Sequence, residues 1–182
     1  MKKLLSVFVV ALCLAGTASA QEGAMSVGGG LNLGLPMGDF GNIAGFGFGF
    51  QARFQYGLTN DLALAGSFGY ISFSEKNSAS SSVMPILASG RYYFTPGDGR
   101  PYGQADLGLT TFSQTFNFNF GGLGGFAGSA SSTNFSIGFG GGYETKLNDK
   151  WSLDFGAGYN IILASGGSLS YIGIRAGANY AL

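Results

Sequence analysis

The chain has 182 residues, enough for one domain; 34 are glycine and only 10% are charged, which argues against a soluble helical protein because glycine is a poor helix former. The formal net charge is zero and no basic patch is present, so binding of nucleic acid has no electrostatic basis. No histidine occurs, which excludes Ser-His-Asp and Cys-His catalysis and histidine-based zinc sites, and we expect neither enzymatic activity nor a cofactor or metal.

The first 20 residues have the three parts of a secretory signal peptide. Lys2 and Lys3 precede an apolar run at 4–15, and Ala18-Ser19-Ala20 has the pattern of a cleavage site. The alternative, a transmembrane anchor, is disfavoured because the run is shorter than the ~20 residues that span a bilayer. We therefore predict a signal peptide over residues 1–20 and a mature chain of residues 21–182, which lacks cysteine.

The mature chain shows a period of two rather than a helical period. Between residues 45 and 56, phenylalanines at every second position alternate with glycine, Gln51 and Arg53, as in a strand with one apolar face. The same pattern predicts eight strands. Their approximate ranges are 24–35, 45–56, 62–73, 83–94, 101–112, 134–145, 151–162 and 170–182.

These strands are long enough to cross a membrane, since a spanning strand needs ~9–11 residues and globular strands average ~5–6. Short polar connections at 57–61, 95–100 and 146–150 alternate with longer ones at 36–44, 74–82, 113–133 and 163–169. This layout predicts an all-β fold, an eight-stranded antiparallel up-and-down transmembrane β-barrel with both termini at the periplasmic, short-turn side. The alternative is a soluble secreted, glycine-rich adhesin or fibre subunit.

Aromatic residues gather near the expected strand ends, which predicts two interfacial girdles. Near the short turns they are Tyr56, Tyr92, Phe94, Tyr102, Tyr143, Trp151 and Tyr180, and near the long loops Phe46, Tyr70, Phe135, Tyr159 and Tyr171.

Charged residues within the strands all fall on the face opposite the apolar one, and so are expected in the lumen. They are Arg53, Arg91, Asp106, Glu144, Asp154 and Arg175. A turn centred at 98–99 would place Arg91 opposite Asp106. Because their charges balance and an eight-stranded barrel is filled by side chains, we predict a salt-bridged plug with Glu144 at its lower margin. The alternative is a path for ions or protons.

The longest connection, 113–133, carries aromatic residues in an alternating pattern whose phase differs from that of the preceding strand. They are Phe116, Phe118, Phe120 and Phe126. The change of phase predicts a bulge or an exit from the membrane near Thr111–Ser113 and a protruding hairpin with its tip at Gly121–Ser132. Such rings would form a surface for binding a ligand; alternatively they fold over the barrel mouth as a lid, or the tip is disordered.

Four segments carry a resemblance to a known family: Leu35–Phe40, Tyr56–Leu62, Arg91–Phe94 and Pro101–Gly108. In this order and spacing, the mature chain resembles the small OmpA/OmpX-like outer-membrane β-barrels of Gram-negative bacteria.

The last strand resembles the family's assembly signal, recognised by the barrel-assembly machinery. Arg175, Gly177, Tyr180 and Leu182 fill its positions, with leucine where phenylalanine or tryptophan is common. Enzymatic relatives depend on histidine, so their activity does not carry over.

The sequence therefore predicts an outer-membrane protein with a structural or surface-interaction role, whose loops form the exposed face. The alternative is a small porin-like barrel or one that transports apolar compounds. The expected partners are outer-membrane lipid, the barrel-assembly machinery, and a surface or apolar ligand at the long loops.

Overall fold

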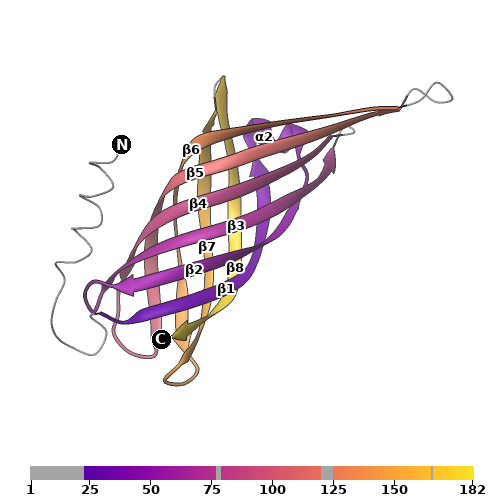
Figure 1. Cartoon of the computed structure of the whole chain (residues 1–182). Helices are drawn as coiled ribbons and strands as arrows, with labels where there is room; N and C mark the ends of the chain where they lie inside the picture. The colour runs from indigo at the N-terminus through magenta and orange to yellow at the C-terminus, as the bar shows by residue number, and fades with distance from the viewer. Residues whose placement is uncertain (1–22, 77–78, 120–124, 165) are drawn as a thin grey trace, which may run out of the picture.

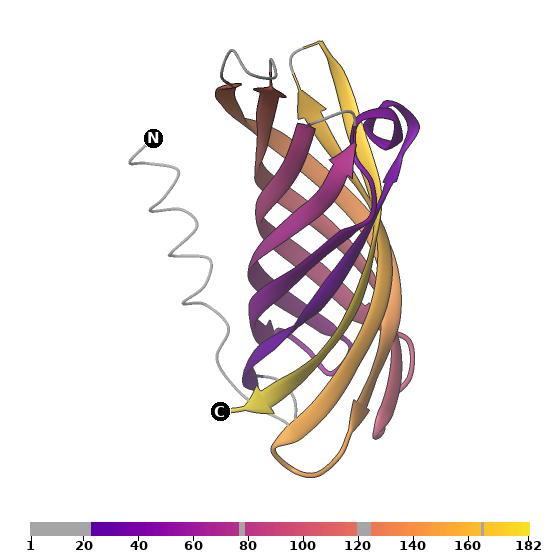
Figure 2. The same cartoon turned by 90° about the vertical axis from the view of Figure 1, so that its right-hand side faces the viewer.

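The computed structural model describes residues 23–76, 79–119, 125–164 and 166–182, so the predicted signal peptide at 1–20 lies outside the described residues. The strands form one closed antiparallel barrel in sequence order, β1 to β8, as Figures 1 and 2 show from two sides. This confirms the predicted eight-stranded up-and-down barrel. The strands are β1 (Met25–Met37), β2 (Gly47–Gly57), β3 (Leu62–Lys76), β4 (Ala79–Tyr93), β5 (Gly99–Asn119), β6 (Gly125–Lys146), β7 (Trp151–Ala164) and β8 (Gly167–Ala181).

The barrel closes between its first and last strands. β1 pairs with β8 from Ser26 opposite Ala181 to Met37 opposite Ser170. Because the barrel is closed, its wall has no free strand edge. The backbone N–H and C=O groups of each strand are then paired with neighbouring strands, as a lipid environment requires. Among the described residues, no helix has the length and hydropathy needed to cross a membrane.

The two ends of the barrel differ. The short turns and the C-terminus lie at one end, and at the other lie α2 (Gly38–Ile43) and the long β5–β6 hairpin (Figure 1). α2 begins at Gly38, whose positive φ of 55° permits the sharp turn out of β1. We call these the short-turn end and the outer end.

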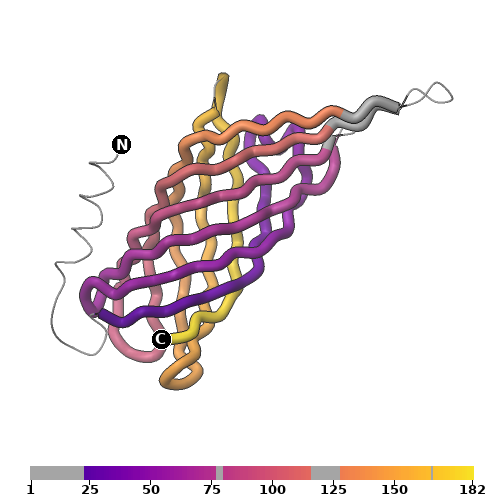
Figure 3. The backbone as a smooth tube through the Cα atoms, in the orientation of Figure 1, coloured from indigo at the N-terminus to yellow at the C-terminus, as the bar shows by residue number. Residues whose placement is uncertain are grey.

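The outer hairpin is longer than the sequence predicted. β5 and β6 remain paired until Asn119 lies opposite Gly125, so the tip is shorter than the expected Gly121–Ser132 and most of 113–133 is strand. In Figure 1 the paired ends of β5 and β6 extend beyond the neighbouring strands, and Figure 3 shows the barrel as a backbone tube in the same orientation. The predicted bulge at Thr111–Ser113 is wrong, because pairing with both β4 and β6 is continuous there.

The outer surface of the barrel wall is apolar. Large side chains such as Phe48, Ile86 and Leu107 are more than half exposed and face away from the lumen. Aromatic pairs lie near the short-turn end, including Trp151 and Tyr180, whose ring centres are 5.1 Å apart. This band and its aromatic margin are the expected surface of a barrel in lipid.

Two tyrosines predicted in the girdles lie inside the barrel instead. Tyr102 is 2% exposed and Tyr171 is 4% exposed, and both are on the lumen side of their strands. Being near a strand end does not determine whether a side chain faces the lumen or the lipid. Its place in the period-two alternation of the strand determines this for both tyrosines.

Candidate functional site: the lumen and the outer hairpin

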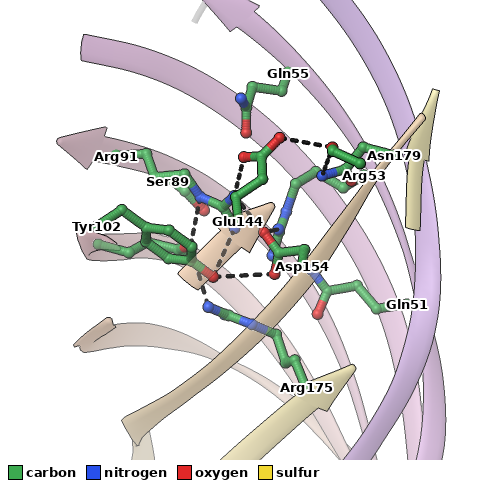
Figure 4. Close-up of polar contacts among 12 residues, drawn as sticks. Gln51, Arg53, Gln55, Ser89, Arg91, Tyr102, Glu144, Asp154, Arg175 and Asn179 are labelled. Carbon is green, nitrogen blue, oxygen red and sulfur yellow. Dashed lines mark hydrogen bonds and ion pairs between the residues drawn. The ribbon is translucent and has the colours of Figure 1, made fainter. Parts of the chain in front are cut away.

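The lumen near the short-turn end holds a network of charged side chains, here called the lumen network (Figure 4). The structure places all six charged residues predicted from the sequence on the inner face of the wall. They come from β2 (Arg53), β4 (Arg91), β5 (Asp106), β6 (Glu144), β7 (Asp154) and β8 (Arg175).

Arg91 lies at the centre of this network and has no exposed surface. Its Nη1 lies 2.5 Å from Asp154 Oδ2 and 3.6 Å from Glu144 Oε2. Its Nε donates a hydrogen bond to Gln104 Oε1 at 3.1 Å, and its guanidinium lies 3.9 Å from the ring centre of Tyr102. One planar cation thus joins β4 to β5, β6 and β7, a geometry suited to arginine.

Asp154 receives donors from three strands. Besides Arg91, the hydroxyl of Tyr102 donates to its Oδ1 at 3.0 Å, and Arg53 Nη1 lies 3.5 Å from its Oδ2. Both carboxylate oxygens are therefore occupied, which offsets the cost of burying the charge.

Glu144 lies on the side of Arg91 toward the short-turn end. It accepts a hydrogen bond from Tyr93 Oη at 2.5 Å and another from Ser152 Oγ at 2.8 Å. It also faces a hollow of about 190 Å³ at that end, lined in part by Arg100 and Lys146.

Asp106 does not lie opposite Arg91 as the sequence predicted. The pairing places Arg91 opposite Gln104 and Asp106 opposite Ser89, two residues from the expected register. Ser89 Oγ and Gln104 Nε2 donate to Asp106 Oδ1, and the Gln104 carbonyl oxygen also accepts from Arg175 Nη2 at 3.2 Å. Gln104 therefore links Asp106 and Arg175 to Arg91.

Among the members of this region that sequence reasoning missed are Arg100 and Gln104. Arg100 was expected in the 95–100 turn, but β5 begins at Gly99, and Arg100 is 8% exposed with its guanidinium 3.9 Å from the Tyr93 ring centre. The sequence could have indicated their inward position, because residues 100, 102 and 104 alternate along the strand with the same period as Asp106, which was predicted to face the lumen.

The interior offers little free space. Two cavities of about 30 Å³ each lie beside the lumen network, one lined by Arg53 and Arg175 and the other by Asp106 and Tyr171. Each has room for one or two waters rather than an organic ligand. No group of three or more metal-ligating side chains occurs in the part of the chain that the structure describes.

The outer end of the lumen is apolar and closed by α2. Phe40 of α2 is fully buried, with its ring centre 4.8 Å from that of Phe73 and 5.7 Å from that of Phe112. We call this group the outer cluster. Its buried members are Phe40, Ala44, Ile71, Phe73, Val83, Ile162 and Tyr171, with Ile43, Phe112 and Leu169 packed against them.

Phe112 gives the physical reason for the change of phase that had suggested a bulge. It occupies an inward-facing position of an unbroken strand and is apolar because the lumen itself becomes apolar there.

The model for "Outer membrane protein beta-barrel domain" matches residues 5–181. The chain belongs to this outer-membrane β-barrel family. No curated protein matches the chain in sequence.

Solved structures of outer-membrane barrels share its fold. Neisserial surface protein A is 22% identical with a TM-score of 0.70, and the match covers 87% of this chain and 99% of that one. Ail of Yersinia pestis is 18% identical with a TM-score of 0.61, covering 88% and 99%. OprG of Pseudomonas aeruginosa is 13% identical with a TM-score of 0.61, covering 90% and 98%. A further structure of Ail contains the heparin analogue sucrose octasulfate.

In this outer-membrane barrel, the β5–β6 hairpin leaves one strand edge open. β6 pairs with β7 only from Phe135 onward, so residues 125–134 pair with β5 alone within the described chain. The side chains of Phe116, Phe118, Phe120 and Phe126 lie outside the described part of the structure.

The predicted assembly-signal residues lie along β8 and at its end. Arg175 is turned to the lumen, and Leu182 is 71% exposed at the short-turn end. Gly177 lies against β1, where an added Cβ would come 2.6 Å from the carbonyl oxygen of Gly29. Tyr180 accepts a hydrogen bond from Lys150 Nζ at 3.1 Å.

Proposed function

We propose that this outer-membrane barrel is a surface anchor: its wall holds the protein in the membrane, and the β5–β6 hairpin presents an interaction surface outside. The observation that carries the proposal is the contrast between a filled lumen and an open strand edge over residues 125–134. A barrel closed by ion pairs suits an anchor better than a channel.

The open edge suits a partner that adds a strand. Residues 125–134 contain no proline and no charged residue, the two devices that usually block pairing at an edge. Ser129 and Ser131 are exposed on this segment. An extended segment of another surface protein could pair through its backbone, with small polar side chains on this strand offering little obstruction.

The outer end is poorly suited to a polyanion such as the heparin analogue bound by Ail. Among its charged residues, Asp39 and Glu75 are acidic and Lys76 is basic, and Lys76 Nζ already donates to the carbonyl oxygen of Gly41 at 2.6 Å. Recognition there depends on backbone and neutral side chains rather than on basic charge.

The proposal includes the route to the membrane. Residues 1–20 direct export and are cleaved, and the exported chain is assembled by the barrel-assembly machinery, which reads Arg175, Gly177, Tyr180 and Leu182. The exposed Leu182 at the short-turn end supports this reading. We assign the barrel no catalytic role, in keeping with the absence of histidine from the sequence.

A second candidate, transport of apolar compounds or a narrow pore, is favoured by the outer cluster. An apolar lumen mouth beneath a short helix would admit an apolar compound if α2 moved. Recordings in planar bilayers separate the candidates, because an anchor closed by the lumen network conducts no ions, whereas a pore shows discrete openings.

The surface role is tested by replacing residues 117–127 with Asn-Gly. This joins Phe116 to Gly128, which lie opposite each other, through a two-residue hairpin turn. We expect host cells displaying the native protein to adhere to one another or to protein-coated surfaces, and cells displaying the shortened protein to lose adhesion while the barrel still folds.

A second variant tests the open edge itself. Ser129→Lys with Ser131→Lys keeps the hairpin but adds charges that oppose strand addition, and it should lose adhesion as well. The matched control is Ser113→Lys with Thr115→Lys, on the same face of β5 opposite Ser131 and Ser129, where β5 is paired on both sides and has no open edge. Equal adhesion by the native and shortened proteins would contradict the proposed function.

A further inference from the structure

We propose that the lumen network binds one small monatomic anion, a halide such as chloride, between Arg53 and Arg175. The site is independent of the proposed surface role.

The charges that line the cavity between Arg53 and Arg175 are not balanced. These two arginines face a single carboxylate, Asp154, which is also paired with Arg91. Positive charge is therefore in excess around this cavity. A buried charge without compensation is costly, so the fold favours an additional anion.

The ion pairs locate the deficit near Arg175. Asp154 is paired with Arg53 and Arg91, and Glu144 with Arg91. Asp106 accepts hydrogen bonds from the neutral Ser89 and Gln104. Within the described residues, Arg175 has no carboxylate oxygen within 4.0 Å, and its Nη2 donates a hydrogen bond to the amide oxygen of Gln104.

Two guanidinium nitrogens have no hydrogen-bond partner in the described chain. The Nε atoms of Arg53 and Arg175 are both buried and unpaired, and Arg53 as a whole is only 9% exposed. Both residues line the same cavity of about 30 Å³. Unpaired donors on buried cations are costly, and a shared acceptor would satisfy both.

The chemistry of the cavity selects the occupant. Guanidinium nitrogens only donate, so the occupant must accept hydrogen bonds, which excludes a metal cation. Asp154 also lines the cavity, and although its oxygens are occupied by Arg53, Arg91 and Tyr102, its charge disfavours a multiply charged anion. The volume holds one or two water-sized particles, too few for sulfate or phosphate.

The decisive experiment is crystallisation of the purified native barrel in sodium bromide, with anomalous diffraction to locate bromide. We expect a single lumen peak within hydrogen-bonding distance of Arg53 Nε and Arg175 Nε. Absence of that peak, with well-defined side chains and only water between the two arginines, would overturn the proposal. This experiment uses only the native protein, so its outcome does not depend on whether a variant folds.

Thermal unfolding in detergent provides the second readout. Because a ligand that binds only the folded state raises its stability, the unfolding midpoint should be higher in sodium chloride than in sodium gluconate at equal ionic strength, by roughly 2–4 °C. Arg175→Gln, refolded in vitro, should lose the difference, and Lys150→Gln, on an exposed turn, should keep it. Equal midpoints of the native protein in the two salts would also count against the site.

Discussion

Arg91 of β4 and Asp154 of β7 form a direct ion pair across the lumen, with Nη1 and Oδ2 2.5 Å apart. Their strands are not neighbours in the sheet, so the pair ties opposite parts of the wall together. Arg91 has no exposed surface and Asp154 is 4% exposed, so the pair is shielded from bulk water.

Asp154→Ala is therefore expected to destabilise the barrel strongly. It leaves Arg91, Arg53 and the Tyr102 hydroxyl without their acceptor, and loss of one member of a buried pair costs about 3–5 kcal/mol. The temperature at which the folded form converts to the slower-migrating unfolded form on a gel should fall clearly. Asp149→Ala, in an exposed turn, is the control and should behave like the native protein. An unchanged transition in Asp154→Ala would show that the lumen network does not stabilise the fold.

Asp106→Ala should have a smaller effect than Asp154→Ala. Its hydrogen-bond donors, Ser89 and Gln104, are neutral, and such a loss costs about 1–3 kcal/mol when polar groups are left buried. The comparison uses the same gel assay, supported by urea unfolding in detergent. If the two variants were equally destabilised, Asp106 would contribute as a charge and not chiefly as a hydrogen-bond acceptor.

The sequence predicted the barrel because its strands are long and strictly alternating. The inward position of Arg53, Glu144 and Asp154 followed from the same period, since a charge on the lipid face is costly. These features depend only on which face of the strand a residue occupies, and the local alternation of apolar and polar residues indicates that face.

The contacts between strands were harder to predict, as Arg91 shows. Pairing depends on the centre of the turn, and a shift of one residue there changes each partner by two. The turn closes with the Phe94 N–H donating to the carbonyl oxygen of Pro101, with Gly97 at a φ of 109°, and this places Gln104 opposite Arg91. Only the turn geometry could supply that register.

The outer cluster was missed for a different reason. Tyr171 was placed in the interfacial girdle, and the change of phase around Phe112 was interpreted as a bulge, because an apolar residue in a membrane barrel is expected to face lipid. At the outer end the lumen is itself apolar, filled by Phe40 of α2. The period gave the correct face for Phe112, and the residue type misled.

Phe40→Ala should loosen the closure of the outer end without unfolding the barrel. Loss of a buried phenylalanine costs about 3–5 kcal/mol. Because α2 is outside the sheet, the substitution should weaken the packing of α2 on the barrel and not the pairing of the strands. We expect the thiol of Val83→Cys, at a fully buried position, to react at least about tenfold faster with a water-soluble maleimide when combined with Phe40→Ala.

Both proteins in that comparison begin at residue 21, which removes Cys13 and leaves one thiol. Phe46→Ala is the matched control, because Phe46 is 50% exposed and is not part of the outer cluster. Equal labelling in the presence and absence of Phe40→Ala would mean that α2 does not seal the lumen.

Leu182→Phe is expected to accelerate assembly in cells, because the family's assembly signal, which the last strand resembles, commonly ends in phenylalanine or tryptophan. Leu182 is 71% exposed, while its backbone N–H donates to the carbonyl oxygen of Met25 at 2.9 Å, so a larger side chain leaves this contact with β1 intact. Pulse-labelled cells should convert the variant to the heat-modifiable folded form faster than the native chain, and Leu182→Ala more slowly. Leu147→Phe, which enlarges another exposed leucine at the short-turn end, should match the native rate. If all four proteins folded at one rate, the identity of the last side chain would have no part in recognition by the assembly machinery.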